Sequence, residues 1–116
     1  MLKKENRLKK RYQYNYVYRA GTHFSGKFVT IYTASSKTKD IKVGFAVTKK
    51  IGKAHVRNLV RRRLREIVYT QIPQLKQNYN LIVVAKDGIT AARFDDLSND
   101  VVALLKKAQM FQWKRF

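Results

Sequence analysis

The chain has 116 residues, no cysteine and a net charge of +19, from 26 basic and 7 acidic side chains. This length suits one domain with a single core, and the lack of cysteine excludes disulfides and thiolate metal sites. Because so much like charge repels itself in a compact chain, the composition indicates a polyanionic partner. Nucleic acid is the commonest such partner, and an anionic membrane is the rival.

The hydrophobic pattern indicates a protein that neither crosses a membrane nor carries a secretion signal. The sequence has no apolar run of roughly 18 residues, the length that spans a bilayer, and its basic start has no apolar segment behind it. We therefore expect a cytoplasmic protein. Residues 1–116 are expected to form one domain, with flexible ends at 1–6 and 110–116.

Residues 12–18 read Tyr-Gln-Tyr-Asn-Tyr-Val-Tyr and permit two structures. The alternation is typical of a strand. In a helix, Tyr14 and Tyr18 would share one face, and Ala20-Gly21 would end it. The local pattern leaves both open.

Two strands are predicted at 28–34 and 41–47, separated by a polar turn. In the second strand the large apolar side chains share one face, which we assign to the core. The small residues Gly44 and Ala46 share the other face and leave room for something to lie against the sheet.

The second half of the chain alternates helix, strand and helix. Apolar residues recur at helical spacing over 54–71, and Pro73 ends that helix. Residues 81–85 are a continuous apolar run, typical of a buried inner strand. Residues 95–109 predict a closing helix with acids at its start and lysines at its end. The expected order is one helix, two or three strands, a helix, a strand and a helix.

The stretch Lys49 to Arg65 holds eight basic residues and no acid. On a helical wheel five basic or amide side chains occupy one arc of about 140°, and the apolar residues take most of the opposite arc. The members of this basic arc are Arg57, Asn58, Arg61, Arg62 and Arg65. A solvated face normally mixes signs, so this face and the preceding loop residues, Lys49, Lys50 and Lys53, are candidates for phosphate binding.

The run VTKKIGKAHVRNLVRRRLRE resembles the signature of the bacterial ribonuclease P protein family. The early NRLKK, the Gly-Thr after the first helix and the FVxxY strand pattern are also similar, so the resemblance covers residues 5 to 109. It favours a helix at 12–18. It implies a two-layer α/β sandwich, similar to one domain of a small-subunit ribosomal protein, with a left-handed βαβ crossover.

The resemblance also implies a function. Such proteins bind the catalytic RNA of ribonuclease P and the 5′ leader of precursor tRNA, and they promote endonucleolytic removal of the leader. The RNA carries the chemistry with Mg²⁺, so we expect no catalytic residue or metal site in the protein, no membrane contact and no obligate protein partner. The residues implied to bind the catalytic RNA are the basic loop and arc. Those implied to form the leader-binding cleft are Tyr14, Tyr18, Tyr32, Asn58, Arg61 and Arg65.

The sequence departs from the family pattern at one motif position, where Leu59 replaces the usual arginine. Arg63 stands where the family is usually uncharged. The two positions are about 40° apart on the helical wheel. We hypothesise that Arg63 partly replaces the missing charge one turn later.

The residues alone leave three other functions open. A structural or ribosomal RNA-binding protein fits the charge equally well, but it would not stimulate precursor tRNA processing. A DNA-binding helix is disfavoured because such readers are usually helical throughout. A protein-only nuclease would need carboxylates that converge on metal, and the sequence shows no such cluster. The isolated His23 and His55 do not make a metal site either.

Overall fold

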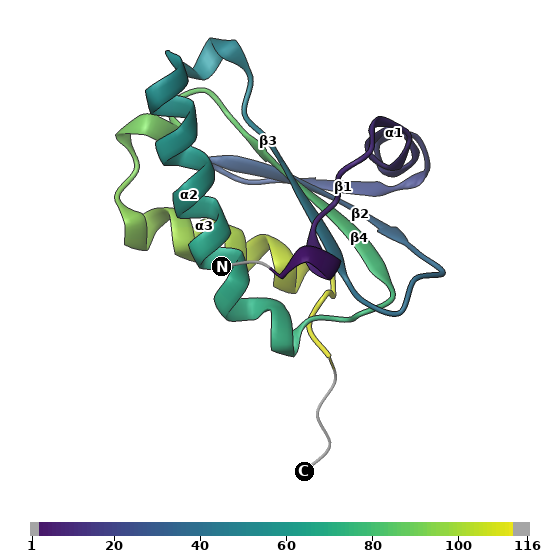
Figure 1. The fold of residues 1–116 in the computed structure, drawn as a ribbon. Helices are drawn as coiled ribbons and strands as arrows, with labels where there is room; N and C mark the ends of the chain where they lie inside the picture. Colours follow the sequence, from purple (N-terminus) through teal and green to yellow (C-terminus); the bar gives the residue numbers. More distant parts are fainter. Residues whose placement is uncertain (1–2, 113–116) are drawn as a thin grey trace.

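The computed structural model describes residues 3–112. Within this part the chain combines one four-stranded sheet with three α-helices (Figure 1). In chain order these elements are α1 Arg11–Ala20, β1 Thr22–Ser25, β2 Val29–Ser35, β3 Lys42–Ala46, α2 Ala54–Gln71, β4 Tyr79–Ala85 and α3 Phe94–Lys107. The predicted mixed fold of α and β elements is confirmed.

The strands are ordered β1-β2-β4-β3 across the sheet. β1 pairs with β2 and β2 with β4 in antiparallel fashion, whereas β3 and β4 are parallel. Two adjacent parallel strands need a long crossover, which α2 supplies as predicted. The inner strand β4 is paired on both sides and is largely apolar, as the continuous run indicated.

The two faces of the sheet carry different helices. α2 and α3 cover one face, and the main core lies between them and the sheet (Figure 1). Helix α1 lies across the opposite face, where Leu8, Val17, Ala34 and Ile82 form a smaller buried cluster. The two faces of β3 divide as predicted: Val43, like Val47 just after the strand, is buried in the main core, and Ala46 packs beside the smaller cluster.

Helix α1 settles the ambiguity over residues 12–18. The side chain of Gln13 turns back and accepts hydrogen bonds from the backbone N–H groups of Lys9 (3.1 Å) and Lys10 (3.0 Å), which organises the start of the helix. At its end the N–H of Gly21 donates to the carbonyl of Val17. A Cβ on Gly21 would lie 2.6 Å from the carbonyl oxygen of Thr33 on β2, so a side chain there would push the helix off the sheet.

The first strand, β1, is the element that the sequence did not locate. It is four residues long and mostly exposed at the edge of the sheet, so it has no alternating apolar pattern to reveal it. The predicted order allowed two or three strands between the first two helices, and β1 is the additional strand that it did not place.

The ends of the described chain are better packed than expected. Asn6 is buried and donates its side-chain amide to the carbonyl of Ile41 (2.8 Å). Met110 is buried at the other end, and its carbonyl accepts from the N–H of Lys76 (2.7 Å). Asn6 and Met110 are thus anchored to the fold, and the flexibility expected for 1–6 and 110–116 stays a prediction. Residues 1–2 and 113–116 lie outside the described part.

Asp100 of α3 ties the helix to the start of β2. One carboxylate oxygen accepts from the N–H of Lys27 (3.0 Å), and the other accepts from Phe28 (2.8 Å) and Val29 (3.2 Å). Asp100→Ala should therefore lower the free energy of unfolding by about 3 kcal/mol, since hydrogen bonds to a charged group are strong and the amides would lose their partner. Urea unfolding measures this. The control is Asp96→Ala in the first turn of α3, and an equal loss in both variants would contradict the prediction.

In the described part of the chain, none of the helices has the length and apolarity needed to cross a membrane.

Candidate nucleic-acid interface

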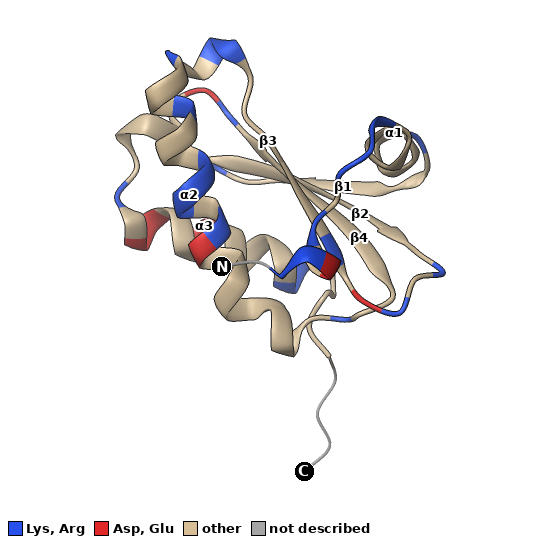
Figure 2. Ribbon diagram, in the orientation of Figure 1, with Lys and Arg blue, Asp and Glu red and all other residues tan. Residues whose placement is uncertain are grey.

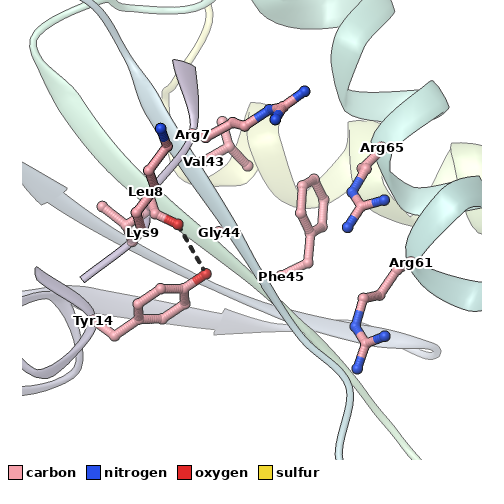
Figure 3. Close-up of a pocket in the computed structure, with 9 residues that line it drawn as sticks. All are labelled: Arg7, Leu8, Lys9, Tyr14, Val43, Gly44, Phe45, Arg61 and Arg65. Atoms are coloured by element: carbon pink, nitrogen blue, oxygen red, sulfur yellow. Dashed lines mark hydrogen bonds between the residues drawn. The ribbon is translucent and has the colours of Figure 1, made fainter. Parts of the chain in front are cut away.

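A cavity of about 500 Å³ lies between α1, β3 and α2 (Figure 3). We call it the Tyr14 cavity. Tyr14 reaches into it from α1, and Arg61 and Arg65 face it from α2 across the edge strand β3. Its lining residues are Arg7, Leu8, Lys9, Tyr14, Val43, Gly44, Phe45, Arg61 and Arg65. Four of these nine are basic and none is acidic, so the cavity suits an anionic ligand with an apolar or aromatic part.

The Tyr14 ring is held in place on two sides. Its hydroxyl donates to the carbonyl of Leu8 (3.3 Å). Its ring lies over Gly44, where a Cβ would come within 2.6 Å of the Tyr14 Cζ atom. The room that the small residues of β3 were predicted to leave is therefore occupied at Gly44 by Tyr14 itself.

The other two predicted tyrosines, Tyr18 of α1 and Tyr32 of β2, contact each other. The rings of Tyr18 and Tyr32 meet edge to face, with centroids 4.8 Å apart and an interplanar angle of 82°. His23 extends this row, with its ring centroid 5.5 Å from that of Tyr32. Tyr18 keeps 40% of its surface exposed, so the pair presents an aromatic surface on the α1 face of the sheet. Tyr18 and Tyr32 do not line the Tyr14 cavity.

Tyr14 and Tyr18 of α1 are neutral at physiological pH. Burial raises the pKa of Tyr14, and this effect outweighs the opposing influence of a backbone hydrogen bond at Phe45 and of the Arg65 charge. Burial also raises the pKa of Tyr18, with smaller contributions in the same direction from Tyr32 and Tyr14. Neutral rings add no negative charge that would repel a nucleic acid.

The basic arc of α2 is divided between two surfaces. Arg61 and Arg65 turn toward the Tyr14 cavity (Figure 3). Arg62 and Asn58 line a second hollow of about 720 Å³ along α2, which we call the α2 groove. Arg65 borders both hollows. The Nη1 of Arg61 donates to the Oδ1 of Asn58 (2.7 Å), so a hydrogen bond links the two sides of the arc.

The α2 groove contains features that the helical wheel did not single out. Its lining residues are His55, Asn58, Leu59, Arg62, Arg65, Glu66, Tyr69 and Thr70. Tyr69 is 44% exposed, and Glu66 places one acid beside the basic arc. His55 is exposed at its rim. Arg57, also on the predicted arc, is half-buried, and its Nε is buried without a hydrogen-bond partner among residues 3–112.

The basic loop precedes α2 as expected. Lys49 and Lys50 lie in a short 3-10 turn, Lys53 immediately precedes α2, and all three are exposed. Gly52 has a φ of 155°, a backbone conformation that side chains rarely adopt. Glycine here lets the chain turn sharply into the helix and keeps the lysines beside its start. Figure 2 shows basic residues both on this loop and along α2.

Sequence reasoning also missed part of the Tyr14 cavity wall. Arg7 and Lys9 belong to the N-terminal segment, which crosses the edge of the sheet because Arg7 forms a bridge with Val43. The basic NRLKK run was the available signal, but only the bridge places it beside Tyr14. Within the described residues, no group of three or more His, Cys, Asp or Glu side chains could hold a metal ion.

The comparisons with known proteins agree on one family. The family model described as ribonuclease P matches residues 2–109. The ribonuclease P protein component of Syntrophomonas wolfei is 35% identical over 111 residues, 96% of this chain and 93% of that protein. The corresponding protein of Caldanaerobacter subterraneus is 33% identical over 114 residues, 98% of each. This chain belongs to the ribonuclease P protein family.

Solved structures support the same assignment. The RNase P protein of Staphylococcus aureus superposes with a TM-score of 0.86 at 25% identity, over 92% of this chain and 98% of that one. The RNase P protein of Thermotoga maritima gives a TM-score of 0.79 at 20% identity, over 87% and 96%, and this likeness shows the fold alone. The predicted resemblance is confirmed. As a ribonuclease P protein component, the chain takes part in tRNA 5′ processing.

The structure sharpens the hypothesis about the position where this ribonuclease P protein has Leu59. Leu59 lines the α2 groove and is 37% exposed, and Arg63 is half-buried one turn later. If Arg63 supplies the missing charge, Arg63→Ala should weaken affinity for ribonuclease P RNA by about tenfold, the effect of one charge-assisted contact. Adding Leu59→Arg to that variant should restore the lost affinity. Electrophoretic titration measures both affinities. An unchanged affinity in Arg63→Ala would contradict the hypothesis.

Proposed function

We propose that this chain is the RNA-binding, non-catalytic subunit of ribonuclease P and that it binds two RNA segments. The catalytic RNA binds the basic loop and the outer side of α2, which carries Arg62. The single-stranded 5′ leader of precursor tRNA binds in the Tyr14 cavity and against the neighbouring pair of Tyr18 and Tyr32. By holding both, the protein promotes removal of the leader.

The observation that carries the proposal is the Tyr14 cavity. An aromatic ring on one wall and two guanidinium groups on the other match the two parts of an unpaired nucleotide, its base and its phosphate. Stacking on an aromatic ring does not depend on base identity, because every base has a flat face. A subunit that handles many precursor tRNAs needs that tolerance.

The tyrosine pair extends the same surface. Tyr18 and Tyr32 contact each other edge to face and leave part of the Tyr18 ring exposed. They lie on the α1 face of the sheet, as does the ring of Tyr14 above Gly44. An unpaired strand could therefore pass from the cavity to this pair. Asn58 and Arg61, which are joined by a hydrogen bond, would border its path at α2.

The loop and outer α2 side suit a structured RNA. Lys49, Lys50 and Lys53 are exposed together ahead of the helix, and Arg62 follows on its exposed side. The unpartnered Nε of Arg57 is a further donor, since a buried N–H without a partner is costly and a phosphate oxygen would satisfy it.

The chemistry in this proposal belongs to the RNA. Mg²⁺ would be bound through the RNA subunit, where it would serve the hydrolysis of the phosphodiester. The protein's part is to bind and position, and its positive charge would offset repulsion between the RNA and its polyanionic substrate.

Reconstitution tests the proposal. The purified chain is mixed with a bacterial ribonuclease P RNA at low Mg²⁺, and 5′ maturation of precursor tRNA is measured beside controls with protein alone and RNA alone. Activity of the mixture only is the expected result. Activity of the protein alone would contradict a non-catalytic role, and an inactive mixture with the cognate RNA would favour a structural RNA-binding protein.

A further inference from the structure

A third hollow, of about 710 Å³, lies on α1 and the connection from β2 to β3, and it is separate from the Tyr14 cavity. We call it the α1 groove. Tyr12, Tyr16 and Arg19 line it from the helix, Lys37 lines it from the connection, and Asn80 lines it from β4. None of these residues lines the Tyr14 cavity or the α2 groove.

The two tyrosines of this groove have no role in the core. Tyr12 is 67% exposed and Tyr16 is 41% exposed. They are four residues apart on α1, so they share one face of the helix, and Arg19 follows one turn later on the same side. The hydroxyl of Tyr16 donates to the carbonyl of Ser35 (3.3 Å), which fixes this ring against the end of β2, whereas Tyr12 stays exposed.

Asn80 provides an independent sign that the groove binds a ligand. Its side chain is on the same face of β4 as Ile82, which packs beneath α1. Only 7% of Asn80 is exposed, yet its Oδ1 is buried and has no hydrogen-bond partner among the described residues. Buried polar atoms are almost always paired, so an unpaired acceptor that borders a hollow indicates a missing donor.

The charge around the groove favours an anionic ligand. Arg19 and Lys37 stand among its lining residues, and none of those residues is acidic. Figure 2 shows basic residues both on α1 and at the tip of the connection between β2 and β3. The groove thus combines stackable rings, positive charge and a buried acceptor, which match a base, a phosphate and a base amino group.

We propose that the α1 groove is a second binding site for unpaired RNA, on the side of α1 away from the Tyr14 cavity. A base stacks on Tyr12, and its neighbour packs against Tyr16. Arg19 and Lys37 bind the backbone phosphates, and an amino group of a base donates to the Oδ1 of Asn80. This site extends the proposed RNA-binding function but does not depend on the leader occupying the Tyr14 cavity.

The test uses the full chain and a short oligoadenylate. Tyr12→Ala should weaken oligoadenylate binding about tenfold, the loss of one stacked base, and Tyr12→Phe should keep wild-type affinity. Since Tyr12 is exposed, neither change should disturb folding. In NMR spectra, oligoadenylate should shift the side-chain amide signals of Asn80, and inorganic polyphosphate should not.

Two further outcomes separate this proposal from the leader assignment. In a Tyr14→Ala, Tyr18→Ala background, the proposal predicts residual oligoadenylate binding that Tyr12→Ala removes. If that background abolishes all binding and the Asn80 signals stay fixed in the wild type, the α1 groove is no RNA site, while the leader assignment stands. Equal shifts of Asn80 with polyphosphate would also overturn the proposal, because they would show an anion site without base recognition.

Discussion

Binding of this chain to ribonuclease P RNA should weaken by about three to four orders of magnitude between roughly 50 and 200 mM monovalent salt. The reason is the release of counterions: each phosphate neutralised by a lysine or arginine frees a cation, so affinity falls as salt rises. The interface proposed for this RNA contains six basic side chains: Lys49, Lys50, Lys53, Arg57, Arg62 and Arg65, the last of which borders both hollows. Equilibrium titration over a salt series measures the slope.

Single substitutions make this prediction specific to the interface. Arg62→Ala should lower the slope of log affinity against log salt by about one unit, because one phosphate contact is lost. Arg62 is exposed, so the change should leave stability intact. Lys107→Ala is the matched control, since Lys107 is also exposed but lies at the end of α3, on an element outside the interface. A flat salt dependence, or an equal change of slope in both variants, would remove the central role given to the basic loop and arc.

The sequence predicted those parts of the fold that burial determines. The apolar run of β4 is buried in the clusters on both faces of the sheet, and the helical stripe of α2 faces the main core, so side-chain burial enforces both patterns. The exposed edge strand β1 left no comparable pattern. The burial of Asn6 and Met110 escaped prediction for another reason: both form hydrogen bonds with residues at least 34 positions away, which local composition does not reveal.

Prediction of the candidate site from the sequence was limited in the same way, because local pattern does not show which residues meet in space. The helical wheel correctly grouped the arginines on one side of α2, but it treated them as one surface. The structure places Arg61 beside the Tyr14 cavity and Arg62 in the α2 groove, and residues of β3 line only the first of these two hollows. The partner of Gly44 was equally hidden from local pattern, since Tyr14 lies thirty residues earlier in the chain.

Replacing Tyr14 and Tyr18 together by alanine should weaken binding of leader-bearing precursor tRNA by about 30-fold or more, and binding of leaderless tRNA far less. Each ring is expected to stack on one base, and a stacked base contributes about 1–3 kcal/mol. The measurement compares the dissociation constants of the reconstituted enzyme for the two substrates. The phenylalanine pair keeps both rings and is the matched control, with an expected loss limited to the hydrogen bond from Tyr14 to Leu8.

Gly44→Ala tests the position of the Tyr14 ring without removing an aromatic side chain. The added Cβ would come within 2.6 Å of the Tyr14 Cζ atom, so the ring must leave its place above β3. If that place forms the leader cleft, this variant should also bind leader-bearing substrate more weakly than leaderless tRNA. Urea unfolding checks that the variant is still stable. A folding defect would differ from the expected effect because it would lower affinity for both substrates alike.

The variant that replaces both tyrosines decides the leader assignment. An equal loss for both substrates in that variant, with its stability retained, would show that the leader does not lie against Tyr14 and Tyr18.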